Sequence, residues 1–111
     1  MDRLVELGQL MDWYGAFLTQ RQRSLVRQYA FEDCSLGEIA EREGITRQAV
    51  RDAIATAETE LRRMESALGL IRKSARTREL LAELRGTGLN ERQSAIAGEL
   101  YALSNSEEQS D

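Results

Sequence analysis

The stretch SLGEIAEREGITRQAVRDAI, residues 35–54, predicts two helices joined by a tight turn. Ser35 and Glu38 have the Ser-x-x-Glu spacing of a capping box, which satisfies two free backbone amides at the start of a helix. Gly44 ends this helix, because a residue without a Cβ takes the left-handed conformation that a sharp corner needs. Thr46 can then cap a second helix. The pattern is that of a helix-turn-helix motif.

The second helix of the motif begins with side chains of the types that read base edges. Arg47 and Gln48 are its first exposed side chains, and Arg51 follows one turn later. Apolar side chains fix the two helices against each other, and these are Ile39, Ala40, Ile45, Val50 and Ile54. We therefore expect a packed motif with a polar, outward recognition helix.

The composition predicts an all-α fold. The chain has 111 residues, 41% of them hydrophobic and 31% charged, and no proline interrupts its helical runs. We expect one helical domain over residues 1–103, with the helix-turn-helix at about 35–67, and a disordered acidic tail over residues 104–111. No apolar run approaches the length that crosses a bilayer, and no signal peptide begins the chain, so no membrane insertion and a cytoplasmic location are expected.

A long apolar seam follows the turn. Its members alternate at spacings of four and three, and they are Val50, Ile54, Ala57, Leu61, Met64, Leu68 and Ile71. Such spacing is typical of a narrow helix-packing surface. The seam packs either on the N-terminal helix of about residues 2–14 or on a second copy, which would give a homodimer.

The C-terminal part is expected to contain two shorter helices. The first runs from about Ser74 to Arg85, with Leu80, Leu81 and Leu84 inward. Its outer face is basic, through Arg72, Lys73, Arg76, Arg78 and Arg85. The last helix begins at the cap Asn90 and carries Ile96, Leu100 and Leu103.

Charge is unevenly distributed along the chain. The net charge is −4, residues 35–65 sum to −2, and only residues 66–88 are basic, at +3. The helix-turn-helix thus lacks the positive surface that supplies most of the affinity in ordinary duplex binding. This weakens the interpretation of the chain as a transcription factor.

The residues needed for enzymatic chemistry are scarce. The chain has no histidine, one cysteine and no glycine-rich phosphate loop, so we expect neither an enzyme nor a bound metal or cofactor. Cys34 is expected to be structural, because no histidine can activate it. The aromatic cluster of Trp13, Tyr14 and Phe17 is expected to lie in the core rather than to stack on bases.

A series of short motifs resembles the YlxM family of small bacterial helix-turn-helix proteins over about residues 11–85. The motifs are Tyr14-Gly15, Leu18-Thr19, Glu32-Asp33, Ser35-Leu36, Glu38-Ile39-Ala40, Thr46-Arg47-Gln48-Ala49-Val50, Asp52 and Leu68-Gly69-Leu70. The resemblance implies a fold similar to region 4 of sigma factors. It also implies an accessory or regulatory role in the signal recognition particle pathway, through the particle's RNA or its GTPase, with DNA as a further possible ligand.

Two classes of function remain open. In the first, nucleic acid is read by the recognition helix and gripped through its phosphates by a basic segment. The recognition residues are Thr46, Arg47, Gln48 and Arg51, and the phosphate-gripping residues are Arg72, Lys73, Arg76 and Arg78. In the second, the chain is a protein-binding adaptor without nucleic-acid affinity, and a DNA-binding transcriptional regulator is a further alternative. The arginines could also be neutralised by their neighbours Glu43 and Asp52.

Overall fold

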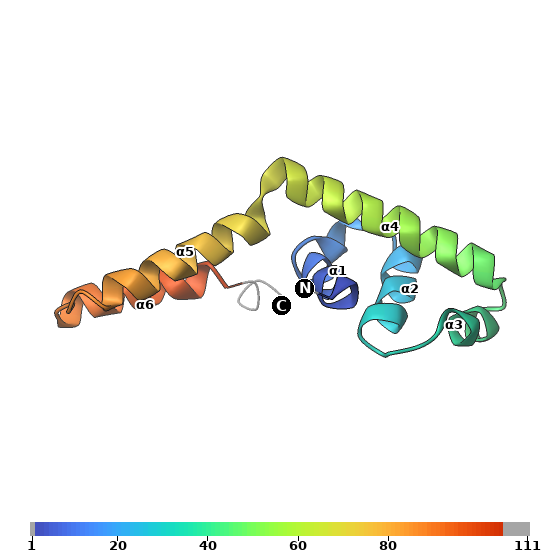
Figure 1. Ribbon diagram of the computed structural model, residues 1–111, viewed down its shortest axis with the longest axis horizontal. Coiled ribbons are helices and arrows are strands. Elements are labelled where there is room, and N and C mark those ends of the chain that lie inside the picture. Colours follow the sequence, from blue (N-terminus) through green and yellow to red (C-terminus); the bar gives the residue numbers. More distant parts are fainter. Residues whose placement is uncertain (1, 106–111) are drawn as a thin grey trace. The chain divides into compact units, whose positions relative to one another are not determined.

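The computed structural model describes residues 2–105, which form six α-helices and one short 3₁₀ helix (Figure 1). No strand occurs among these residues, so the predicted all-α fold is confirmed. The elements are α1 (Arg3–Tyr14), η1 (Gly15–Phe17), α2 (Gln20–Ala30), α3 (Leu36–Glu43), α4 (Arg47–Leu68), α5 (Leu70–Arg85) and α6 (Glu91–Leu103).

The chain divides after Leu68 into two compact units, which we call unit 1 and unit 2. Unit 1 contains α1 to α4 and therefore the whole helix-turn-helix, and unit 2 contains α5 and α6. A single domain over residues 1–103 stays a prediction. The tail expected at residues 104–111 lies, from residue 106 onward, outside the described part of the chain.

Unit 1 is built around one face of α4. Helices α1, α2 and α3 lie along one side of α4 (Figure 1), and each contributes fully buried side chains to a common core. The largest fully buried side chains of this core, those of α4 included, are Leu7, Tyr14, Leu25, Val26, Ile39, Val50 and Leu61. Removing such side chains from water contributes roughly 1.5–3 kcal/mol each before conformational entropy is subtracted.

The predicted helix start and stop signals are all present in the motif. The Ser35 hydroxyl accepts from the Glu38 amide at 3.1 Å, and the Glu38 carboxylate accepts from the Ser35 amide at 2.8 Å. Gly44 has a φ of +69°, and Thr46 Oγ1 accepts from the Ala49 amide at 3.0 Å. The turn is therefore held by local chemistry that the sequence makes visible.

The seam on α4 is covered by its own chain. Val50, Ile54, Ala57 and Leu61 are buried against α1, α2 and α3. A homodimer through this part of the seam is thus wrong, because the surface is already occupied. The seam also stops earlier than expected: α4 ends at Leu68, where Gly69 takes the left-handed conformation and a new helix starts.

Unit 2 is a hairpin of two helices with little interior. Helix α5 starts at Leu70 rather than at Ser74 as expected, and its buried side chains are Ser74 and Leu81. Leu80 and Leu84, expected inward, are 47% and 44% exposed. One neighbouring helix covers only one side of α5, and that side carries Leu81.

One aromatic expectation of unit 1 was also wrong. Tyr14 is fully buried, as expected of a core residue, and its hydroxyl donates to the Glu65 carboxylate at 2.6 Å. Phe17, in contrast, is 73% exposed. It lies in the 3₁₀ turn after α1, so its side chain no longer follows the inner face of that helix.

The capping box of α3 offers a test of the motif's stability. Ser35→Ala removes the acceptor for the Glu38 amide and should lower the free energy of unfolding by about 1 kcal/mol. Ser66→Ala is a matched control, because Ser66 lies exposed within α4 and alanine is the better helix former. Urea unfolding followed by circular dichroism measures both. Equal stability of the two variants would contradict the capping role.

Candidate nucleic-acid interface

The start of α4 presents two guanidinium groups to solvent. Arg47 and Arg51 are both exposed, and neither has a hydrogen bond or ion pair with any of residues 2–105. The Arg47 guanidinium lies across α3 at Gly37, where an added Cβ would stand 2.9 Å from Nη2. The missing side chain of Gly37 therefore leaves room for Arg47 to lie against the motif.

Neighbouring acidic groups do not neutralise these arginines. The Asp52 carboxylate accepts from the Gln48 amide group at 2.8 Å, and the Glu43 carboxylate accepts from Gln28 at 3.2 Å. The alternative in which Asp52 and Glu43 pair with the arginines is thus wrong for this structure. Gln48 is the less available member of the cluster, because its NH₂ group is already engaged and bidentate base contact needs that donor.

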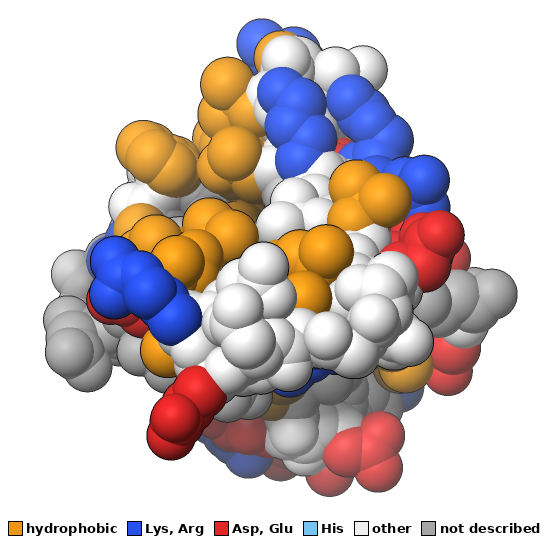
Figure 2. All heavy atoms as spheres, turned by 90° about the vertical axis from the view of Figure 1, so that its left-hand side faces the viewer, with side chains coloured by type: hydrophobic (Ala, Val, Ile, Leu, Met, Phe, Trp, Pro, Cys, Tyr) orange, Lys and Arg blue, Asp and Glu red, His pale blue; other side chains and the backbone are white. Residues whose placement is uncertain are grey.

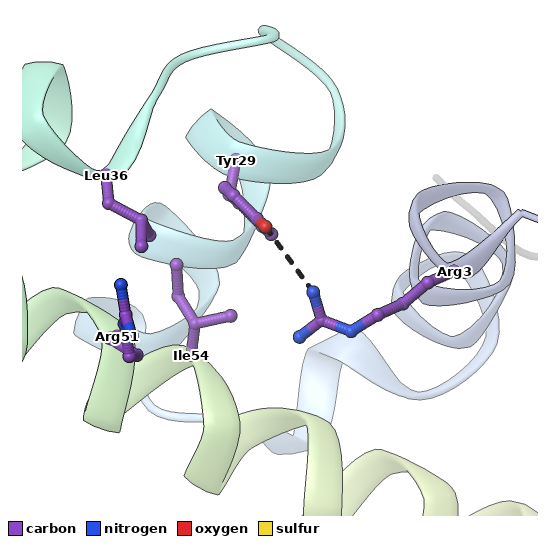
Figure 3. Close-up of a pocket in the computed structure, with 5 residues that line it drawn as sticks. All are labelled: Arg3, Tyr29, Leu36, Arg51 and Ile54. Carbon is purple, nitrogen blue, oxygen red and sulfur yellow. Dashed lines mark hydrogen bonds between the residues drawn. The ribbon is translucent and has the colours of Figure 1, made fainter.

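Arg51 points into a hollow of about 300 Å³ that also receives Arg3 (Figure 3). The hollow is lined by Arg3 from α1, Tyr29 from α2, Leu36 from α3, and Arg51 and Ile54 from α4. Arg3 donates to the Tyr29 hydroxyl at 3.4 Å, and its guanidinium lies 5.9 Å from the centre of the Tyr29 ring. The guanidinium of Arg51, which has no partner among residues 2–105, and the Tyr29 phenol are groups suited to an anionic oxygen.

Glu58 forms an ion pair with the guanidinium of Arg3. Its carboxylate accepts from Arg3 at 2.7 Å and from Arg62 at 2.9 Å, which joins α1 to α4. Burial opposes ionisation of this carboxyl, but the hydrogen bonds from Arg3 and Arg62 outweigh it and lower the pKa of Glu58. The same contacts, led by the hydrogen bond to Glu58, raise the pKa of Arg3.

Sequence reasoning found Arg51 but missed Arg3 and Tyr29. These residues are 48 and 22 positions away from Arg51 along the chain, and neither belongs to a motif that carries a spacing signal. Only the packing of α1 and α2 against α4 brings them together.

The predicted basic face of α5 is only partly available. Arg72, Lys73 and Arg76 are exposed, but Arg76 pairs with Glu79 at 3.4 Å. Arg78, expected outward, is half-buried and donates to the buried Ser74 hydroxyl at 2.7 Å. The eight predicted site residues thus fall into two groups of four, one at the start of α4 in unit 1 and one on α5 in unit 2.

Among residues 2–105, no group of three or more histidine, cysteine, aspartate or glutamate side chains could hold a metal ion. Within the same range, no helix is long and apolar enough to span a membrane. Cys34 is half-buried in the connector between α2 and α3, with its sulfur 3.7 Å from the Glu32 carbonyl oxygen.

The sequence of this chain matches one known protein family. Residues 1–99 match the model of UPF0122, a family of helix-turn-helix proteins described as YlxM / p13 like. A UPF0122 protein of Symbiobacterium thermophilum is 42% identical over 84 residues, which are 76% of this chain and 78% of that protein. A UPF0122 protein of Geobacillus kaustophilus is 40% identical over 85 residues, 77% of each chain.

The Glu58 bridge predicts a pH-dependent stability. Because the folded-state pKa of Glu58 is lowered, its contribution is present above the ordinary value of 4.5 and is lost as the pH falls through the lower folded value. Glu58→Gln should cost about 1 kcal/mol at pH 7, and the deficit should shrink in acid. Urea unfolding at pH 7 and at decreasing pH measures this.

Glu60→Gln provides the control for Glu58→Gln. Glu60 lies on the same helix and pairs with Arg63, three residues further along α4. Its replacement should change the free energy of unfolding by no more than a few tenths of a kcal/mol. A Glu58→Gln deficit that is the same at every pH would show that the carboxylate charge is not what stabilises the α1–α4 contact.

Proposed function

This chain belongs to the YlxM / p13-like family of helix-turn-helix proteins, and on that basis we propose that it is a nucleic-acid-binding accessory or regulatory protein of the signal recognition particle pathway. Its ligands are the particle's RNA, its GTPase, or both. The pathway and these partners rest on the family resemblance. Nucleic-acid binding rests in addition on the start of α4.

The observation that carries the proposal is the pair of unpaired guanidinium groups on the first turns of the recognition helix. Arg47 and Arg51 are four residues apart, so they lie on one side of α4 and reach adjacent oxygens of a phosphate backbone. Arg62 and Arg63, further along α4, are in contrast paired with the carboxylates of Glu58 and Glu60.

Local charge matters here because the chain as a whole is acidic. Unit 1 carries a net charge of −3 from its sequence, so long-range attraction to a polyanion is weak. Binding must then come from short-range contacts at a positively charged point. The unpaired guanidinium of Arg51 at the hollow, next to the exposed Arg47, is such a point.

The α5 residues have a smaller role in this proposal than the charge count alone predicts. Arg76 and Arg78 each already have a partner within the chain, whereas Lys73 has no ion pair among the described residues. We therefore assign Lys73 to a supporting phosphate contact. Arg76 and Arg78 could join only by giving up Glu79 and Ser74.

The partner is identified by direct comparison. The purified chain is presented in parallel with signal recognition particle RNA, the particle GTPase and random duplex DNA at low salt. Binding to the RNA above the DNA supports the proposed function. Preference for duplex DNA would instead favour a transcriptional regulator, and binding of the GTPase alone would favour the protein-binding adaptor; both results overturn the nucleic-acid role in the particle.

The recognition-helix arginines predict a defined loss of binding. Replacing Arg47 and Arg51 together by alanine should weaken nucleic-acid binding by at least tenfold at low salt and lower the salt slope by about two, since each lost phosphate contact releases about one counterion less. Arg63→Ala is the control, because Arg63 lies on the same helix and already pairs with Glu60. Fluorescence anisotropy over a salt series measures both variants.

The comparison with Arg76→Ala/Arg78→Ala separates the two groups of basic residues. That double variant should weaken binding less than Arg47→Ala/Arg51→Ala, because its arginines are engaged within the chain. The reverse order would place the main phosphate contacts on α5. An equal and small effect of all variants would remove both groups from the interface.

A further inference from the structure

Helix α6 is apolar on two sides. Ala97 is buried and Gly98 is half-buried, and this side faces α5, since Gly98 lies near the Arg85 guanidinium. Ile96, Leu100 and Leu103 lie on another side at spacings of four and three, and they are 46%, 47% and 73% exposed. A helix with apolar residues on two sides is typical of one packed between two layers. The structure shows only one of those layers.

Helix α5 adds to the same exposed surface. Leu80 and Leu84 are one turn apart, and helical geometry puts them on the face of the hairpin that also carries the α6 stripe. We call the five residues Leu80, Leu84, Ile96, Leu100 and Leu103 the hairpin face. Figure 2 looks onto the end of this hairpin and shows hydrophobic side chains gathered in a patch with basic side chains beside it.

Unit 2 needs a cover for this face. The side chains buried inside the hairpin are Ser74, Leu81 and Ala97, of which only one is a large apolar residue. Chains of about 40 residues rarely bury enough surface to be stable alone. Five large apolar side chains exposed together mark an interaction site rather than ordinary surface.

The charges of the two helices indicate what covers the hairpin face. Helix α5 carries a net charge of +3 and α6 a net charge of −1. A second hairpin turned over the first would bring its acidic α6 onto the basic α5, and the reverse contact would occur at the same time. Lys73 and Glu99 have no ion pair with described residues, so both are available for such contacts.

The register of the hairpin supports the same arrangement. The Ser74 hydroxyl donates to the Ser104 carbonyl, which pairs the start of α5 with the end of α6. In this antiparallel register Leu80 lies within one turn of Leu100, and Leu84 within one turn of Ile96. A two-fold axis along the hairpin therefore sets apolar residues of α5 opposite apolar residues of the other copy's α6.

We propose that two copies of this chain associate through their hairpin faces, forming an antiparallel four-helix bundle in which α5 of each copy packs on α6 of the other. In such a two-fold contact each pair of residues meets twice, and the assembly is complete at two copies. The expected contact pairs are Leu80 with Leu100 and Leu84 with Ile96. This interface lies in unit 2 and leaves the start of α4 free in each copy.

Sedimentation of the full-length protein and of two charge variants tests the proposal. Wild type should sediment as a dimer at micromolar concentration. Leu80→Lys and Leu100→Glu should each be monomeric, because a dimer of either variant would bury two unpaired charges, one from each copy. Mixing the two variants should restore a dimer. The contact between position 80 of one copy and position 100 of the other occurs twice in the dimer. In the mixed dimer, one of these contacts joins lysine to glutamate and the other joins leucine to leucine.

The control and the contrary outcomes are equally specific. Ala95→Glu adds the same charge at an exposed position of α6 outside the hairpin face and should stay dimeric. Circular dichroism must show unchanged helix content in the monomeric variants. A monomeric wild type, a dimer that survives Leu100→Glu, or variants that fail to re-pair would each overturn the proposed association.

Discussion

The burial of one face of α4 is the constraint on which unit 1 depends. Val50, Ile54 and Leu61 lie in the core that α1, α2 and α3 form along that helix. Because α1, α2 and α3 pack against α4 between Val50 and Leu61, the first turns of this helix are supported by the core. The exposure of Arg47 and Arg51 follows from this burial, since they occupy the part of the helix that the core leaves to solvent.

The features predicted correctly from the sequence are those encoded within a few residues. The capping box at Ser35, the cap at Asn90 and the left-handed Gly44 depend on neighbours a few positions away, and all are present. The apolar side of α4 was also predictable from its spacing. Its partner was not, because an amphipathic stripe specifies that a surface is buried but not by which helix.

The predictions that failed depend on contacts distant in sequence or on missing neighbours. Leu80 and Leu84 have the spacing of a core stripe, but only α6 packs on α5 within the unit, and it covers the other side. Arg78 was predicted to be a surface cation, but its guanidinium donates a hydrogen bond to the buried Ser74 hydroxyl. Arg3 joins the candidate site only through the packing of α1, which carries no local signal.

An acidic protein can bind a polyanion through unpaired cations that lie close together on a supported surface. Here the ion pairs of Arg3 with Glu58 and of Arg62 with Glu6 join α1 to α4, and Arg51 faces the same hollow as Arg3. The paired arginines thus build the surface, and the unpaired ones are available to a ligand.

The central claim is that nucleic acid contacts the first turns of α4. Nuclear magnetic resonance titration of the isotope-labelled protein with signal recognition particle RNA tests it most directly, because each backbone amide and arginine side chain reports separately. The account predicts the largest shifts at residues 46–51 and at the Arg3 and Arg51 side chains. Shifts confined to α5, to α6 or to the far end of α4, with residues 46–51 unchanged, would contradict it.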